Sequence, residues 1–213
     1  MNPESVYDGD YFLRGKETGK SLYENYRWLP ELTIPMAQRI VKHCGIKAGH
    51  RVLDLGCARG YLVKALRHLG VDAHGIDISE WAIENADPET KPYLSLGIIA
   101  EVFQKEEFDW VIAKDVLEHI HFVDFAVKDM MCAASVGVFA VVPLSKYDKG
   151  RYVIEDYEKD VTHCQRWSLP TWASLFISPR WSVEVAYRVR GVKDNYSQYP
   201  MGNGFITARR LEE

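Results

Sequence analysis

Short apolar runs alternate with amphipathic segments from residue 30 onward, and this alternation constrains the fold more than any other feature of the chain. The apolar runs are typical of strands, whereas the segments between them repeat apolar residues with the period of a helix. We expect strands at residues 50–56, 71–78, 91–97, 108–115, 136–144, 181–192 and 204–211. We expect helices at residues 30–46, 61–70, 80–86, 117–134 and 169–177. This pattern predicts an α/β fold with an open, doubly wound, mostly parallel sheet.

Two stretches fall outside the alternation. Residues 1–30 are rich in tyrosine and charged side chains, and residues 145–167 interrupt the pattern after the fifth strand. Such additions usually close over the carboxyl edge of a sheet, where ligands bind. We therefore expect an N-terminal lid at 1–30 and one domain at 31–213 with an insertion at about 145–167.

Composition excludes several classes of protein. The chain has 26 Lys and Arg against 30 Asp and Glu, and a net charge of −4 gives no general attraction to nucleic acid. The longest apolar run, residues 136–144, is about half the length of a membrane-spanning helix, and the sequence does not open on a secretory signal. The four cysteines lie far apart, which argues against a zinc site or a disulfide framework. We expect a soluble, cytoplasmic protein.

The stretch "VLDLGCARGYL", residues 52–62, is a strand that leads through a glycine-containing turn into a helix. Glycines at 56 and 60 let backbone approach a ligand, and the following helix offers free N–H groups. A dinucleotide-binding turn would need glycine at 56, 58 and 61, but Ala58 and Tyr61 stand at the last two. Asp54 would repel a pyrophosphate but suits a ligand with an amine and a positive centre.

A second acid, Asp77, follows 23 residues later at the end of the next strand. A carboxylate there can accept both hydroxyls of a ribose, and Ile78 beside it can pack on an adenine ring. The implied ligand is adenosine that carries an amino acid instead of phosphates. Two alternatives stay open: Asp54 can hold turn amides, and Asp77 can cap the helix that begins near residue 79.

Four segments in this order and spacing, "VLDLGCARGYL", "HGIDISEWAI", "FDWVIAKDVLEHI" and "FAVVPL", resemble the motifs of class I S-adenosylmethionine-dependent methyltransferases. The resemblance implies a Rossmann-like, seven-stranded sheet whose last strand is antiparallel. It implies S-adenosylmethionine as cofactor and S-adenosyl-L-homocysteine as product. The cofactor contacts that it implies are at Asp54, Gly56, Cys57, Gly60, Asp77, Ile78, Lys114 and Asp115.

Two positions depart from the family pattern. Ala58 replaces the usual middle glycine, a change that backbone contacts can tolerate. Many members carry an acid after the third strand for the adenine amine, but "LSLGIIAEVF" offers none at that place. Backbone groups near Gly97 or Ile98 could bind the adenine amine in place of that acid.

A general base helps to transfer a methyl group to a hydroxyl, whose proton must leave, and histidine suits this near neutral pH. His119, in the "LEH" triplet after the fourth strand, and His163, in the insertion, are the candidate catalytic residues. We expect His121 at the surface. One carboxylate and two imidazoles at Glu118, His119 and His163 are a set that suits several transition ions, but we expect no metal.

The resemblance thus favours an enzyme that methylates a small molecule at oxygen, such as a sugar or secondary metabolite. Its N-terminal segment, with Arg14, Lys16 and Arg27, also offers cations for an anionic acceptor or for the cofactor carboxylate. Two alternatives remain, a non-catalytic module that only binds the cofactor and an RNA-directed methyltransferase, although nucleic acid does not fit the charge. The acceptor, the methylated atom and the oligomeric state are left open.

Overall fold

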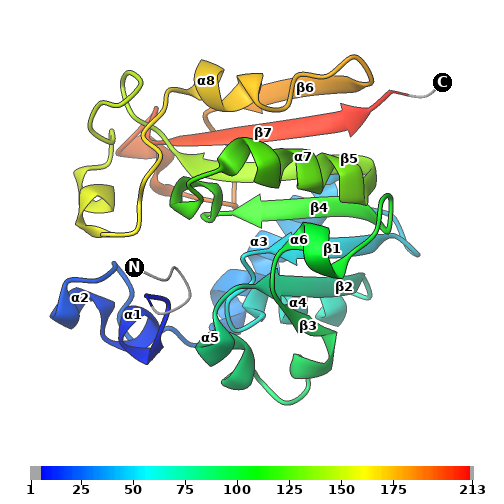
Figure 1. The fold of residues 1–213 in the computed structure, drawn as a ribbon, viewed down its shortest axis with the longest axis horizontal. Coiled ribbons are helices and arrows are strands. Elements are labelled where there is room, and N and C mark those ends of the chain that lie inside the picture. Colours follow the sequence, from blue (N-terminus) through cyan, green and yellow to red (C-terminus); the bar gives the residue numbers. More distant parts are fainter. Residues whose placement is uncertain (1–5, 212–213) are drawn as a thin grey trace.

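A computed structural model describes residues 6–211 and shows one seven-stranded sheet in the order β3-β2-β1-β4-β5-β7-β6 (Figure 1). The strands are β1 (Arg51–Leu55), β2 (Asp72–Asp77), β3 (Leu94–Leu96), β4 (Phe108–Lys114), β5 (Ala134–Pro143), β6 (Trp181–Ala186) and β7 (Asn203–Arg210). The first five run parallel, and β7 pairs antiparallel with both β5 and β6. The predicted fold class, with its antiparallel last strand, is confirmed.

Helices cover both faces of the sheet because the inner strands are apolar on both sides. On one face α3 (Pro30–Cys44) and α4 (Tyr61–His68) pack against Trp110, Phe139 and Phe205. On the other, α7 (Val123–Ala133) and α8 (Leu169–Ser174) pack against Val111 and Ile206. Strands buried on both faces explain the continuous apolar runs of the sequence.

Two short helices follow the strands nearest the free edge of the sheet. α5 (Glu80–Glu84) follows β2, and Ser79 caps it by accepting a hydrogen bond from the Ala82 N–H at 3.0 Å. α6 (Ile99–Val102) follows β3 and was not expected. The third strand is shorter than predicted because a 3₁₀ turn, η2 (Lys91–Tyr93), takes up its first half. Among residues 6–211, no helix is long and apolar enough to cross a membrane.

The predicted helix at 117–134 is wrong in its first third. The chain forms a 3₁₀ turn, η3 (Leu117–His119), and only then the helix α7. The carbonyl of Glu118 accepts the N–H groups of Cys164 and Gln165 at 2.9 and 3.1 Å, and the Gln165 side chain donates to the carbonyl of Ile120 at 2.8 Å. Since the insertion takes these carbonyls, they are not free for a helix.

The N-terminal segment (residues 6–29) and the insertion (residues 145–167) lie beyond the carboxyl ends of the parallel strands and face one another (Figure 1). The segment forms two short helices, α1 (Gly9–Leu13) and α2 (Gly15–Thr18), and the insertion contains η4 (Glu155–Lys159). The aromatic rings of the segment pack on Ala58 and Ala82, which follow β1 and β2. Residues 6–29 thus lie at the carboxyl edge of the sheet, while residues 1–5 lie outside the described part, and a role as a lid remains a prediction.

Candidate active site

The turn after β1 has the left-handed backbone that its glycines permit. Gly56, Ala58 and Gly60 have φ values of +71°, +48° and +74°. The N–H groups of Gly56 and Cys57 both donate to the carbonyl of Ile76 in β2, at 2.8 and 3.1 Å. Ala58 thus adopts the conformation that a glycine would adopt more easily. The turn is fixed by the neighbouring strand, with its backbone at the carboxyl edge of the sheet.

Asp54 is buried and borders a cavity of about 550 Å³ between this turn, the N-terminal segment and the end of β4. Burial raises the pKa of Asp54 to about 8; Lys114 lowers the pKa and Asp77 raises it further. The buried acid therefore faces a cavity without a cation sufficient to ionise it. The cavity is lined by Lys16, Leu22, Tyr23, Glu24, Asn25, Tyr26, Arg27, Leu29, Leu32, Thr33, Met36, Asp54, Gly56, Cys57, Ala58, Tyr61, Leu62, Lys114 and Asp115.

Asp77 holds backbone amides in this structure. Its two oxygens accept the N–H groups of Ala58 at 2.7 Å and Ser79 at 2.8 Å. Burial raises the pKa of Asp77, although these hydrogen bonds act in the opposite direction. A carboxylate oxygen can accept more than one hydrogen bond, so these contacts leave acceptor capacity for a ribose. Gly60, Asp77 and Ile78 do not line the 550 Å³ cavity, and their ligand contacts remain predictions.

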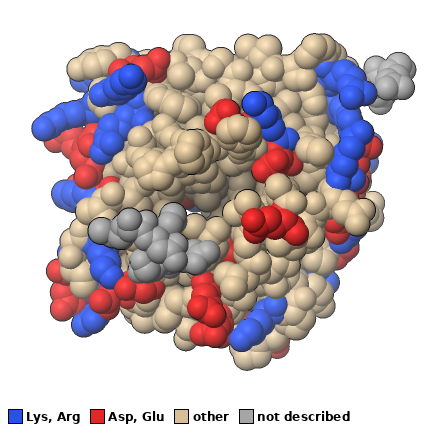
Figure 2. Space-filling view, in the orientation of Figure 1, with Lys and Arg blue, Asp and Glu red and all other residues tan. Residues whose placement is uncertain are grey.

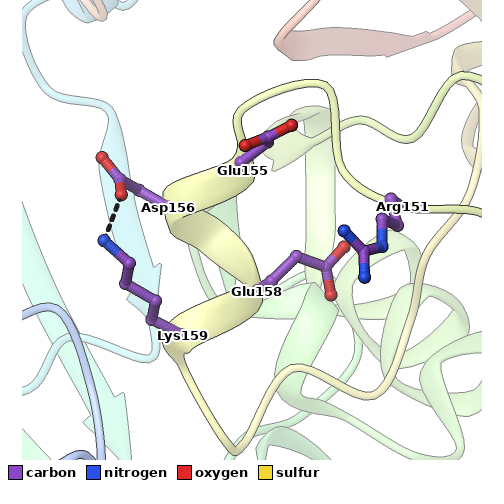
Figure 3. A pocket seen from close by; sticks show the side chains of 5 residues that line it. All are labelled: Arg151, Glu155, Asp156, Glu158 and Lys159. Atoms are coloured by element: carbon purple, nitrogen blue, oxygen red, sulfur yellow. Dashed lines mark hydrogen bonds and ion pairs between the residues drawn. The ribbon is translucent and has the colours of Figure 1, made fainter.

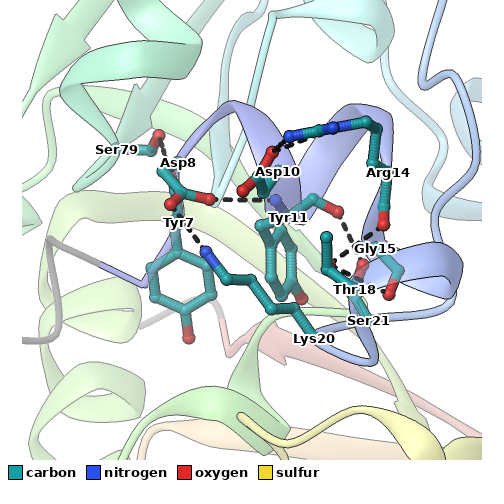
Figure 4. Close-up of polar contacts among 10 residues, drawn as sticks. All are labelled: Tyr7, Asp8, Asp10, Tyr11, Arg14, Gly15, Thr18, Lys20, Ser21 and Ser79. Atoms are coloured by element: carbon teal, nitrogen blue, oxygen red, sulfur yellow. Dashed lines mark hydrogen bonds and ion pairs between the residues drawn. The ribbon is translucent and has the colours of Figure 1, made fainter.

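The N-terminal segment covers the edge of the sheet next to Asp77. Ser79 Oγ donates to the carbonyl of Tyr7 at 2.6 Å, and Phe12 stacks on Trp81 with ring centroids 5.5 Å apart. Figure 4 shows the contacts that tie this segment together around Tyr11, including its link to Ser79. Arg14 pairs with Asp10 at the surface instead of pointing at the cavity.

His119 and His163, the two candidate catalytic residues, lie together, and their catalytic role remains a prediction. Their ring centroids are 4.6 Å apart at an angle of 60°. His119 Nδ1 is 2.7 Å from Thr162 Oγ1, and His163 Nδ1 is 2.8 Å from the carbonyl oxygen of Tyr157. Burial lowers the pKa of His119 to about 4 and also lowers the pKa of His163, so both rings are neutral at pH 7. His121, by contrast, is exposed, as expected.

These features, a glycine turn after β1, acids at two neighbouring strand ends and a paired set of imidazoles, can be compared with known proteins. A family model described as a methyltransferase domain matches residues 27–177, well over half of the chain. The chain belongs to the class I S-adenosylmethionine-dependent methyltransferases. The resemblance inferred from the four sequence segments is confirmed, and with it the cofactor.

This methyltransferase is 33% identical over 117 residues to the ubiquinone biosynthesis O-methyltransferase of Bradyrhizobium diazoefficiens, with 51% of this chain and 46% of the relative covered. A relative of the same name from Methylococcus capsulatus is 31% identical over 94 residues, 40% of this chain and 39% of the relative. The matched region is thus less than half of each relative's length.

Two solved structures show the same fold at low sequence identity. The methyltransferase in a Haloferax volcanii complex with the Trm112 methyltransferase activator has a TM-score of 0.69 at 15% identity, covering 86% of this chain and 92% of that one. The Burkholderia thailandensis 1,6-didemethyltoxoflavin-N1-methyltransferase, with 1,6-didemethyltoxoflavin and S-adenosylhomocysteine bound, has a TM-score of 0.62 at 17% identity, covering 85% of this chain and 80% of that one.

Beside the cavity of the methyltransferase lies an ion cluster centred on Asp115. Lys114 and Lys193 each place Nζ 2.5 Å from one of its oxygens. Burial alone would raise the pKa of Asp115, but the two ammonium groups hold it well below its usual range. Lys193 also contacts Tyr157 and Asn203, each at 3.1 Å, so it joins the end of β4 to the insertion and to β7. Sequence reasoning missed Lys193, which stands in a turn-rich stretch without a motif.

Glu118, next to His119, completes the polar groups on this side. Its Oε2 is buried, with no hydrogen-bond partner among the described residues. Burial and the charge of Asp115 raise the pKa of Glu118 to about 8. One ligand atom each from Glu118, His119 and His163 lie within 4.8 Å of one another, a set of the kind that holds a divalent transition ion. The expectation that no metal is used remains a prediction.

A separate hollow of about 310 Å³ lies on the insertion and is lined by Arg151, Glu155, Asp156, Glu158 and Lys159 (Figure 3). Lys159 pairs with Asp156 at 2.6 Å. The sequence places no predicted site residue here, and none of the lining residues borders the Asp54 cavity. This hollow is therefore separate from the candidate active site at Asp54.

Proposed function

We propose that the enzyme transfers a methyl group from S-adenosylmethionine to a hydroxyl oxygen of a small molecule. On the cofactor side, Asp54 would bind the ammonium group, the backbone of residues 56–60 would lie along the cofactor, and Asp77 and Ile78 would contact ribose and adenine. The cavity fits such a ligand because Asp54 is a buried acid whose raised pKa marks the lack of a sufficient cation. A bound ammonium would supply that charge.

On the acceptor side, the proposal depends on the imidazoles of His119 and His163. His119 and His163 face each other between the ends of β4 and β5 and the N-terminal segment, with Tyr7 packed edge-on against His119 at 6.1 Å. Figure 2 shows a hollow near the middle of the face that it draws, with mainly uncharged residues beside it and acidic and basic side chains interspersed further out. A site enclosed by a segment and an insertion suits a small molecule better than a polymer.

For methyl transfer the protein must align the cofactor with the acceptor hydroxyl and provide a base. When bound, S-adenosylmethionine supplies a methyl group on a positively charged sulfur. His119 or His163, as a neutral imidazole, would take the proton of the acceptor hydroxyl. The hydroxyl oxygen could then bond to the methyl carbon while the electron pair of the carbon–sulfur bond leaves with the sulfur. The N-terminal segment and the insertion exclude water and hold the hydroxyl in line.

Turnover of a panel of acceptors tests the proposal. The protein is incubated with S-adenosylmethionine and phenols, catechols or sugars, and mass spectrometry locates the added methyl group. We expect O-methyl products, together with turnover losses in His119→Ala and His163→Ala that leave cofactor binding by calorimetry intact. Methylation only of nitrogen, carbon or RNA would overturn the acceptor class. Cofactor binding without turnover on any acceptor would favour the non-catalytic alternative. The name of the O-methyltransferase relatives supports this choice of acceptor.

A further inference from the structure

A chain of hydrogen bonds connects His119 to a buried carboxylate in the insertion. His119 Nδ1 is 2.7 Å from Thr162 Oγ1, and that hydroxyl donates to Asp160 Oδ1 at 2.5 Å. Asp160 is buried, and its Oδ1 also accepts the backbone N–H of Thr162 at 3.0 Å. Since the hydroxyl proton of Thr162 points to Asp160, the hydroxyl oxygen can only accept from the ring. The proton of neutral His119 is therefore on Nδ1, and Nε2 carries the lone pair.

The N-terminal segment holds the Asp160 end of this series of hydrogen bonds. Tyr11 OH donates to Asp160 Oδ2 at 2.9 Å, across 149 residues of sequence. The backbone of Tyr11 is itself fixed on both sides, because its N–H donates to Asp8 at 3.0 Å and its carbonyl accepts from Ser21 Oγ at 2.6 Å (Figure 4). Each member of the chain is thus buried or partly buried and held by neighbours, so the geometry is fixed before an acceptor arrives.

We infer that Thr162 and Asp160 are positioning residues that make His119 the general base, with Tyr11 holding Asp160 in place. This inference rests on the proposed O-methyl transfer. When Nε2 of His119 takes the acceptor proton, the ring becomes an imidazolium whose Nδ1–H points through Thr162 to the Asp160 carboxylate. A buried acid in this place fixes the tautomer and stabilises the charge that forms. The proton moves only from the acceptor oxygen to Nε2.

The hydrogen bond that orients the His163 ring gives less electrostatic support than the one that orients His119. His163 Nδ1 also donates, but to the neutral carbonyl of Tyr157. A carbonyl sets the tautomer as well, yet it offers a dipole where His119 has a link to a full negative charge. The geometry therefore assigns His119 to the proton transfer and leaves His163 as a contact for the acceptor.

Three substitutions test the chain of bonds. Thr162→Val keeps the shape but removes the hydroxyl. Because the base itself stays in place, we expect kcat to fall roughly 10- to 100-fold, less than most of the roughly 100- to 10,000-fold that a general base contributes, while the KM for S-adenosylmethionine stays unchanged. Thr162→Ser keeps a hydroxyl and should restore most of the rate. Val161→Ala changes an exposed neighbour and serves as the matched control.

Nitrogen NMR of labelled histidine provides a readout that a structural role would not move. The His119 signals, assigned by their loss in His119→Ala, should show the Nδ1–H tautomer in the wild type and a mixture of tautomers in Thr162→Val. This measurement needs no acceptor, so it stays decisive even if no hydroxyl substrate is found. An Nε2–H tautomer in the wild type would overturn the inference, as would full kcat in Thr162→Val. Activity lost to EDTA and restored by a divalent ion would overturn it too, because the metal would then occupy the lone pair.

Discussion

The strongest prediction concerns the proton on Asp54. Burial raises the pKa of this acid to about 8 in the ligand-free protein, so at pH 7 only about a tenth of the molecules carry it ionised. If Asp54 binds the ammonium group of S-adenosylmethionine, it must give up its proton on binding. We therefore expect about one proton to be released per cofactor bound at pH 6–7.

The size of the effect follows from the distance between pH and pKa. Ionising Asp54 at pH 7 costs about 1.4 kcal/mol, and this cost grows by the same amount for each pH unit below. The cofactor Kd should therefore fall about tenfold per pH unit between pH 5 and 7. Isothermal titration calorimetry in buffers of different ionisation enthalpy measures both the Kd and the number of protons released.

Asp54→Asn is the control, because it keeps the shape and cannot ionise. The variant should release no proton, and its Kd should be about 10- to 100-fold higher at pH 7, as expected for loss of a hydrogen bond between charged groups. Proton release that persists in the variant would assign the titration to another acid, such as Asp77. A pH-independent Kd without proton release in the wild type would refute the placement of the ammonium group at Asp54.

The same raised pKa affects the stability of the free protein. Because the folded-state pKa of Asp54 lies above its unfolded value of 3.8, the folded state binds the proton more tightly in this window. Stability should thus be fully present below pH 3.8 and fall as pH rises towards 8. Without cofactor, Asp54→Asn should be more stable than the wild type by up to about 4 kcal/mol at pH 7, with the difference vanishing near pH 4. Urea unfolding at both pH values measures it.

Three further substitutions test the site and its cover. Asp77→Asn should raise the cofactor Kd at least about tenfold and also lower the Tm, because the carboxylate accepts two backbone N–H groups as well as the proposed ribose; an unchanged Kd by calorimetry would remove it from the cofactor site. Gly56→Ala should destabilise the fold by about 1–3 kcal/mol, since a methyl group there overlaps Val116 and φ is +71°; wild-type denaturant stability would contradict this. Phe12→Ala should loosen the N-terminal segment and speed trypsin cleavage within it, because Phe12 is buried. Leu13→Ala, at a side chain that is 38% exposed, should not.

Much of the fold was predictable because parallel strands that are buried on both faces appear in the sequence as nearly continuous apolar runs. The strands at Arg51–Leu55 and Asp72–Asp77 were found from apolar runs, and the neighbouring positions of Asp54 and Asp77 follow from parallel pairing. The break before α7 was not predictable in this way. An apolar helical period continues across residues 117–123, but the insertion takes the carbonyl of Glu118. Only tertiary contacts decide such a case.

The short helices of the N-terminal segment could not be predicted either, because they too depend on tertiary contacts. α1 and α2 have five and four residues, too few for a period to show, and they are held by packing of tyrosine rings. Lys193 was missed because a single lysine in a turn has no pattern. Its role depends on contacts with Asp115 and Tyr157, which lie 78 and 36 residues away along the chain.

The two halves of the site thus differ in how the chain encodes them. Groups proposed for the cofactor stand at strand ends close together in sequence, where the sheet itself sets their spacing. Groups proposed for the acceptor site come from the N-terminal segment, η3 and the insertion, and side-chain hydrogen bonds such as Tyr11 to Asp160 hold them in place. Substitutions in those three segments can therefore change the acceptor while the sheet and the buried acid at its edge stay the same. Comparison of this chain with its O-methyltransferase relatives is most informative about the acceptor in these segments, and about the cofactor at Asp54 and Asp77.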